Sequence, residues 1–165
     1  DIDSLTEGMP GAGSYDLVMS TYGTVGWLPD LQKWAATVAA FLRTGGSLVL
    51  VDFHPVVWMF DNDFQEIKYP YFNFGPLHEE LDGTYADRNA PIHASCISWN
   101  HSLSEIVQAM LSNGLRVDAF DEWDYSPYPC FARQIEVATG RCQIPGLEGK
   151  IPMLYGFKAT KIHED

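Results

Sequence analysis

The spacing of apolar residues changes twice between residues 15 and 55, and these changes predict a strand, a helix and a second strand. Residues 15–20 (YDLVMS) hold three contiguous apolar side chains, as in a strand that is covered on both faces. Apolar residues then recur at helical spacing; they are Leu31, Trp34, Ala35, Val38, Phe41 and Leu42. Residues 47–53 (SLVLVDF) return to the pattern of a buried strand.

Both ends of the predicted helix carry the residue types that favour a start and a stop. Pro29 and Asp30 stand at the start, with Asp30 as the expected N-cap. Arg43 suits the negative end of the helix dipole, and Gly45-Gly46 is expected to end the helix.

A strand, helix and strand in this order predict a βαβ unit, whose two strands pair in parallel through a right-handed crossover. In open sheets of this kind, ligands bind beyond the carboxyl ends of the strands. Residues 20–28 follow the first strand and residues 53–58 follow the second. We therefore expect a functional site to involve these two loops.

An insertion rich in aromatic residues is predicted over residues 56–100. Several turn signals interrupt it, and Asp82-Gly83 favours a hairpin. An excursion of this length is either a lid or pocket wall, or a second small core that covers the sheet.

The last third of the chain predicts one helix and two strands. Ser102 and Glu105 have capping-box spacing, and Gly114 provides the stop. The expected buried stripe of this helix is Leu103, Ile106, Val107, Met110 and Leu111. Residues 115–123 and 153–161 are strand candidates, whereas residues 126–149 are broken by Pro and Gly and predict a loop.

Composition narrows the class of protein. The 165 residues are 46% hydrophobic and 19% charged, which is ordinary for a single globular domain. A net charge of −12, with no basic cluster, disfavours nucleic acid; the acidity suits either a cationic ligand or solubility alone. Three cysteines without CxxC spacing indicate a reducing cytoplasm, and the absence of a long apolar run disfavours a membrane span.

Four short motifs, taken in order, resemble those of bacterial class I S-adenosylmethionine-dependent methyltransferases. They are GWLPDL at residues 26–31, FHP at residues 53–55, GTYAD at residues 83–87 and WNHSLSEI at residues 99–106. The resemblance covers essentially the whole chain. It implies an α/β, partial Rossmann-like fold in a single domain, residues 1–165, with the aromatic insertion near the ligand edge.

The family's sheet has seven strands, with the last one antiparallel between the fifth and sixth. By the resemblance, residues 15–20, 47–53, 115–123 and 153–161 correspond to strands four, five, six and seven. Strands one to three have no counterpart, nor has the Gly-rich turn beside the cofactor. The chain starts at Asp1 without a Met, so it is expected to be truncated, with an amino-terminal half elsewhere.

The resemblance also implies a cofactor site for S-adenosylmethionine. Thr21, Tyr22 and Gly23 would line its sulfonium and methionine end. Trp27 and Leu28 would flank the adenosine or cover the site, and Asp1, with Ile2 beside it, matches the residue that binds the adenine amino group. The alternative for the two aromatic residues is a purely structural role, with Trp27 as a helix staple and Tyr22 as a core side chain.

A small-molecule acceptor would face the second loop and the insertion. His54 is the candidate general base, because an imidazole titrates near neutrality; a histidine bonded to backbone is the alternative. Trp58, Tyr85 and His101 are the candidate acceptor-binding residues, and His101 has a local helix-start role as its alternative.

No metal is expected: His78, Glu79, Glu80, Asp87 and His93 lack the spacing of a ligand set and predict a solvated acidic loop. The expected function is therefore methyl transfer from S-adenosylmethionine to a small molecule. The alternative is a non-catalytic module that acts through dimerisation or as one half of a split protein, because the first strand would present an unpaired edge. Another doubly wound enzyme, such as an NAD protein, has no supporting motif.

Overall fold

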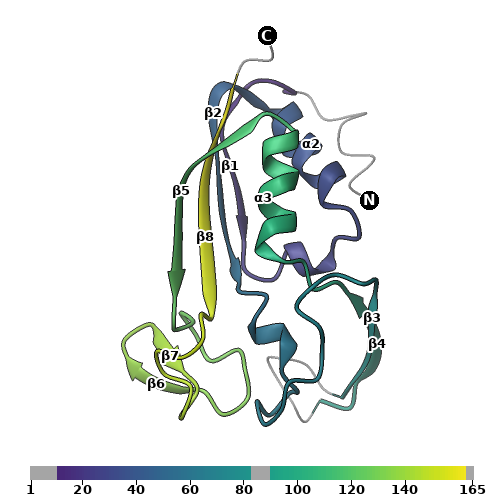
Figure 1. Ribbon diagram of the computed structural model, residues 1–165, viewed down its shortest axis with the longest axis vertical. Coiled ribbons are helices and arrows are strands. Elements are labelled where there is room, and N and C mark those ends of the chain that lie inside the picture. The colour runs from purple at the N-terminus through teal and green to yellow at the C-terminus, as the bar shows by residue number, and fades with distance from the viewer. Residues whose placement is uncertain (1–10, 83–89, 163–165) are drawn as a thin grey trace.

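A four-stranded mixed sheet forms the centre of the computed structural model, which describes residues 11–82 and 90–162 (Figure 1). Its order is β1-β2-β8-β5. The strands are β1 (Tyr15–Thr21), β2 (Leu42–Phe53), β5 (Leu115–Trp123) and β8 (Leu154–Lys161). β1 and β2 pair in parallel, and β8 runs antiparallel to both β2 and β5. The predicted α/β class and the antiparallel insertion of the last strand are confirmed.

Two helices, α2 (Leu31–Phe41) and α3 (Leu103–Ser112), pack together on one face of this sheet (Figure 1). Asp30 caps α2, because one oxygen of its carboxylate accepts from the backbone N–H groups of Gln32 and Lys33 at 2.9 and 3.1 Å. The shared core is made of apolar side chains from both helices and all four strands; its members include Trp34, Val38, Leu48, Leu50, Ile106, Met110, Leu115 and Phe157, with Val18 of β1 packed against them.

β2 begins at Leu42 and not at residue 47, so the prediction that Gly45-Gly46 ends the helix is wrong. Arg43 accordingly lies in the strand, where it pairs with Asp16 of β1. The glycines lie at a register shift between β1 and β2. A Cβ at Gly46 would lie 2.8 Å from the carbonyl oxygen of Tyr15. This position therefore requires glycine because two backbones approach closely there.

The buried stripe of α3 differs at one position from the sequence prediction. Ala109 is fully buried with Ile106 and Met110, whereas Leu111 is exposed. Residues 106, 109 and 110 share one helical face, and residue 111 falls a further 100° around the axis. Gly114 ends the helix with a φ of +70°, as predicted.

β1 lies at the edge of the sheet, and the face turned away from the helices is apolar there. Leu17 and Met19 are exposed on this strand. Exposed apolar side chains beside an unpaired edge are typical of a surface that receives another segment or chain.

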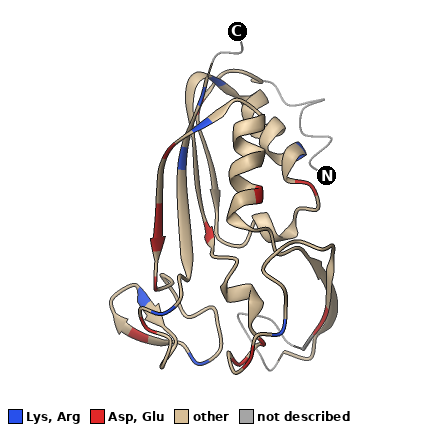
Figure 2. Ribbon diagram, in the orientation of Figure 1, with Lys and Arg blue, Asp and Glu red and all other residues tan. Residues whose placement is uncertain are grey.

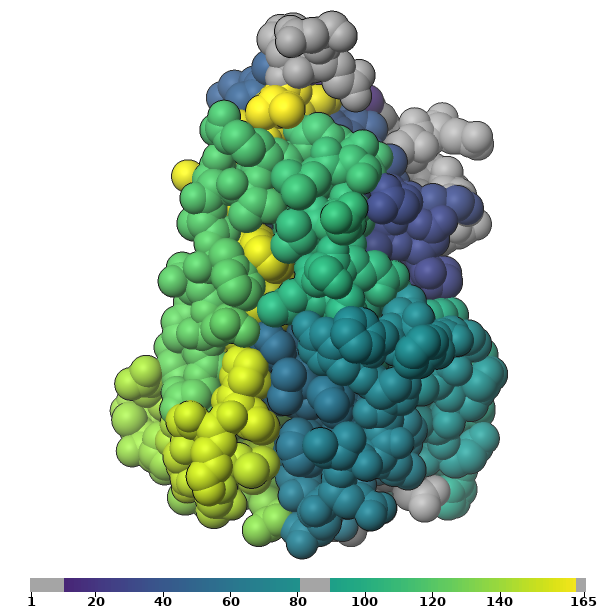
Figure 3. Space-filling view, viewed as in Figure 1, coloured from purple at the N-terminus to yellow at the C-terminus, as the bar shows by residue number. Residues whose placement is uncertain are grey.

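Two hairpins lie at the carboxyl end of β1 and β2 (Figure 1). The predicted hairpin of the insertion is formed by β3 (Leu77–Asp82) and β4 (His93–Ser98). Asp82 pairs with His93, and Gly83 of the predicted turn lies outside the described residues. Residues 70–82 and 90–100 pack beside the base of α3 in the space-filling view (Figure 3).

The second hairpin corrects the expectation that residues 126–149 form a loop. β6 (Ile135–Ala138) pairs with β7 (Arg141–Gln143). Its sequence signal is the alternation of Ile135 and Val137 before Thr139-Gly140, where Gly140 has a φ of +67°. No helix in residues 11–82 or 90–162 has the length and apolar composition needed to cross a membrane.

Candidate functional site

The parallel strands β1 and β2 end side by side, and the loop after β1 starts the candidate site. Thr21 of β1 pairs with Val51 of β2, and the N–H of Tyr22 donates to the Val51 carbonyl at 2.8 Å. The chain then turns through positive φ at Tyr22 (31°) and Gly23 (78°) before the single turn η2 (Val25–Trp27). The carboxyl edge is therefore occupied by the loop that the sequence predicted.

Asp52, near the end of β2, holds this loop in place. Its side chain is only 3% exposed. One carboxylate oxygen accepts from the N–H groups of Gly23 and Phe53 at 2.5 and 2.7 Å, and the other accepts from Thr24 and Val25 at 3.0 Å each. Successive N–H groups that converge on one carboxylate make a concave nest, and charged hydrogen bonds of this kind are strong.

Sequence reasoning missed Asp52, although a signal was present. A lone acidic residue between Val51 and Phe53 interrupts an apolar strand at its carboxyl end. Charged side chains are rarely buried without partners. A buried strand that ends in such a residue therefore indicates backbone donors nearby.

The Asp52 contacts explain the conformation of the loop. A positive φ at Tyr22 costs about 1–2 kcal/mol relative to the usual helical or extended regions. The Thr24 hydroxyl adds a bond of 2.8 Å to the carbonyl of Thr21. A Cβ on Gly23 would meet no atom within 4 Å, so the space beside this glycine is open.

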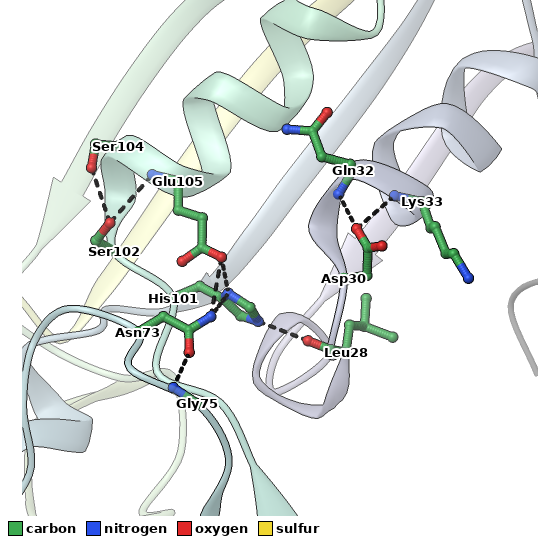
Figure 4. Close-up of polar contacts among 10 residues, drawn as sticks. All are labelled: Leu28, Asp30, Gln32, Lys33, Asn73, Gly75, His101, Ser102, Ser104 and Glu105. Atoms are coloured by element: carbon green, nitrogen blue, oxygen red, sulfur yellow. Dashed lines mark hydrogen bonds and ion pairs between the residues drawn. The ribbon is translucent and has the colours of Figure 1, made fainter.

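His101 fastens the far end of the same loop (Figure 4). This side chain is buried, and its Nε2 donates to the carbonyl of Leu28 at 2.7 Å. Nδ1 lies 2.8 Å from Oε1 of Glu105 and 3.2 Å from Nδ2 of Asn73. Trp99 adds a second link, since its N–H donates to the carbonyl of Gly26 at 2.8 Å.

These contacts change the expected capping box at the start of α3. Ser102 accepts from the N–H of Glu105 at 3.3 Å, which confirms the N-cap. The Glu105 carboxylate instead contacts His101 and Asn73, whose amide donates to it at 3.1 Å (Figure 4). His101 therefore joins the loop after β1, helix α3 and the insertion, and both of its ring nitrogens contact protein groups.

His54 is buried, whereas the sequence predicted a ring that faces the crevice. Its Nδ1 accepts from the N–H of Val56 at 3.1 Å, so the neutral ring carries its proton on Nε2. Nε2 lies 2.8 Å from Oε1 of Glu122, without the alignment of a full hydrogen bond. Burial lowers the pKa of His54, and the charge of Glu122 only partly opposes this.

Tyr155 forms a row across the sheet with Asp52 of β2 and Glu122 of β5. It pairs with Asp52 on one side and with Glu122 on the other. Burial raises the pKa of the Tyr155 phenol, and the charge of Asp52 adds to that rise. The row therefore holds a neutral phenol between two acidic side chains.

Trp58 lies after β2 in the short turn η3 (Val57–Met59), and its ring contacts Phe53 at the end of β2 and Phe131 in the segment after β5. Asn100 ties this region to the insertion, because its amide donates to the carbonyls of Pro55 and Pro70 at 3.1 and 2.9 Å. A cavity of about 150 Å³ lies beside Asn100, lined by residues 70 and 72–77.

The predicted site residues are only partly brought together. Thr21 ends β1, and Tyr22, Gly23, Trp27 and Leu28 lie in the loop that follows it, where Trp27 is exposed. The predicted residues Asp1, Ile2 and Tyr85 lie outside the described residues. Among residues 11–82 and 90–162, no group of three His, Cys, Asp or Glu side chains has the arrangement of a metal site.

The chain is similar to known proteins in structure, but no similarity in sequence was found. No family model and no curated protein matches the chain. A protein from Listeria monocytogenes assigned as an S-adenosylmethionine-dependent methyltransferase is similar at a TM-score of 0.59 and 15% identity, over 96% of this chain and 67% of that one. An S-adenosylmethionine-dependent methyltransferase from Mesorhizobium loti gives 0.55 and 15%, over 97% and 67%.

A third similar structure is geranyl diphosphate C-methyltransferase from Streptomyces coelicolor A3(2), at a TM-score of 0.51 and 15% identity, over 95% of this chain and 51% of that one. The chain thus spans between about half and two thirds of the length of these three structures. With the parallel pair β1–β2 and the antiparallel β8 between β2 and β5, the chain has the fold of class I S-adenosylmethionine-dependent methyltransferases.

Proposed function

We propose that this chain is part of an enzyme that transfers a methyl group from S-adenosylmethionine to a small molecule. The observation that carries the proposal is the Asp52 carboxylate, which fixes residues 23–25 at the carboxyl edge of a parallel strand pair. Binding sites in open α/β sheets lie at this edge. A buried carboxylate that accepts from three successive loop amides is a strong reason for one loop conformation.

The residues present fit one side of the cofactor. Gly23 leaves open space beside the backbone, and Tyr22 and Trp27 of the same loop are 40% and 53% exposed. We assign Thr21, Tyr22 and Gly23 to the methionine and sulfonium end, and Trp27 and Leu28 to the adenosine. The cofactor supplies the methyl group as a sulfonium, a cation that an aromatic face attracts.

Methyl transfer is a displacement, so these residues act mainly by positioning the reactants and excluding water. A proton released by the acceptor needs a base. The lone pair of neutral His54 is bonded to Val56, whereas Glu122 is a partly exposed carboxylate 2.8 Å from His54. We therefore propose that Glu122 accepts the proton, with the neutral ring of His54 beside its carboxylate.

A second proposal is that the active unit needs another polypeptide. β1 is an edge strand with exposed Leu17 and Met19, and the similar structures contain additional chain. An amino-terminal half that adds strands beside β1 fits this edge, as does a second copy in a dimer. The three free cysteines support a reducing, cytoplasmic setting for it.

Calorimetric titration with S-adenosylhomocysteine tests the proposal. We expect a dissociation constant on the order of micromolar, either for the chain alone or after addition of the amino-terminal half of a similar methyltransferase. Gly23→Ala is expected to weaken binding roughly tenfold, since its Cβ enters the open space beside the loop.

Gly140→Ala is the matched control. Gly140 also has a positive φ, and a Cβ there would likewise meet no atom within 4 Å, but it lies in the β6–β7 turn. The substitution should cost similar backbone strain and leave binding unchanged. Absence of binding both alone and with the added half would contradict the proposed function.

A further inference from the structure

Aromatic side chains from three separate loops meet at the carboxyl edge of the sheet. Tyr22 follows β1, Phe53 and Trp58 belong to the end of β2 and its following turn, and Tyr128 and Phe131 follow β5. We refer to these five residues as the aromatic cluster. Phe53 is its centre, with ring centroids at 6.0 Å from Tyr22, 5.9 Å from Trp58, 6.3 Å from Tyr128 and 5.1 Å from Phe131.

The cluster is ordered by ring contacts and yet open to solvent. Phe53 is 8% exposed, whereas Tyr22, Trp58 and Tyr128 are 40%, 40% and 39% exposed. Most of the ring pairs meet edge to face, the arrangement that the ring quadrupole favours. The rings of Tyr22, Trp58 and Tyr128 therefore pack around the buried Phe53 and still present apolar surface to solvent.

The acidic balance of the chain disfavours a negatively charged ligand. In the described part of the chain, the cation–π contacts are at Tyr69 and Tyr125, outside the cluster. Arg133 follows Phe131 by two residues, and its guanidinium, which keeps its charge, donates to the carbonyl of Asp63. Acidic segments lie near the carboxyl ends of β2 and β5 (Figure 2), and the net charge of the chain is −12.

We propose that the aromatic cluster binds the methyl acceptor, and that this acceptor carries a planar aromatic ring without negative charge. A flat ring can stack on the exposed faces of aromatic residues, and these negative ring faces tolerate a neutral or cationic partner better than an anionic one. The inference rests on the proposed function and adds the chemical class of its substrate. Tyr128 becomes a specificity-determining residue of the loop after β5, where sequence reasoning placed no site residue.

A matched set of probes tests this class directly, with no cofactor present. The probes are 2-naphthol (neutral), N-methylquinolinium (cationic) and 2-naphthyl phosphate (anionic), titrated into the whole chain and followed by saturation-transfer NMR. We expect the neutral and cationic probes to bind, and the phosphate to bind at least about tenfold more weakly, because the chain carries a net charge of −12.

Tyr128→Leu keeps an apolar side chain but removes a ring, so it should weaken binding of 2-naphthol about two- to tenfold. Trp58→Leu is the second variant, should Tyr128→Leu fail to fold by circular dichroism. Phe74→Leu is the control, since Phe74 is an exposed aromatic residue outside the cluster.

The inference is overturned if 2-naphthyl phosphate binds as well as 2-naphthol, or if Phe74→Leu weakens binding as much as the cluster variants do. Binding of the neutral probe with loss in the cluster variants supports it. This result is independent of S-adenosylhomocysteine titration, so a failed cofactor titration beside a successful probe titration would locate the fault in the proposed function.

Discussion

Replacement of Asp52 by asparagine is the sharpest test of how the loop after β1 is held. Both carboxylate oxygens are used, and each accepts from two backbone N–H groups. An asparagine side chain offers one acceptor oxygen and one NH₂ group. Asp52→Asn therefore removes the acceptor for two of the four amides and places a donor against them.

The size of the effect follows from those two lost bonds. A hydrogen bond to a charged group contributes about 1.5–3 kcal/mol, so two of them amount to about 3–6 kcal/mol. Water that reaches the partly exposed loop will offset some of this. We predict a loss of about 2–4 kcal/mol in the free energy of unfolding for Asp52→Asn. S-adenosylhomocysteine affinity should fall as well, because the loop loses its fixed conformation.

Asp30→Asn is a control that makes the same chemical change at a different geometry. Both backbone N–H groups at this cap donate to the same oxygen of Asp30, and the single amide oxygen of an asparagine can accept both bonds. Aspartate and asparagine are equally favourable as N-caps. Its free energy of unfolding should stay within about 0.5 kcal/mol of the unchanged chain. Urea unfolding followed by circular dichroism measures both variants. If Asp52→Asn is no more costly than Asp30→Asn, the argument from two occupied oxygens is wrong.

Three further predictions concern other parts of the fold. Gly46→Ala should cost about 1–3 kcal/mol in urea unfolding, since its Cβ would lie 2.8 Å from a backbone oxygen, whereas Gly26→Ala meets its nearest atom at 3.6 Å and should unfold almost as the unchanged chain does. His101→Phe leaves the Leu28 carbonyl without its donor and should cost about 1–3 kcal/mol, with faster amide exchange in residues 26–28; unchanged exchange would argue against the link. Because burial lowers the pKa of His54, the unfolded chain takes up this proton first as the pH falls, so stability is full above about pH 6.5 and declines below it. Urea titrations between pH 5 and pH 8 should show a smaller decline for His54→Phe, and an equal decline would contradict the assignment.

The central strands were predictable because their patterns are local. Residues 15–20 and 115–123 agree with β1 and β5 almost to the residue, since contiguous or alternating apolar runs identify strands without tertiary information. The first residues of β2 were missed, because Gly45-Gly46 has the usual sequence of a helix stop. Only the approach of the Tyr15 carbonyl shows why glycine is needed inside a strand.

The candidate site was predictable in its location but not in its chemistry. The edge of a βαβ unit is fixed by topology, so the loop at residues 21–28 could be identified from the sequence. Three of the four partners of Asp52 are 27–29 residues away in the sequence, and Glu122 approaches His54 from a strand beyond β8. Such pairings depend on strand order and register, which no local pattern specifies.

The most direct test of the account is a backbone-amide NMR titration of the chain with S-adenosylhomocysteine. If the loop held by Asp52 forms the cofactor site, the largest chemical-shift changes will fall on residues 21–28, with Gly23 and Thr24 among them. Residues 135–143 of the β6–β7 hairpin should not respond. Saturable binding whose shift changes leave residues 21–28 untouched would contradict the central claim.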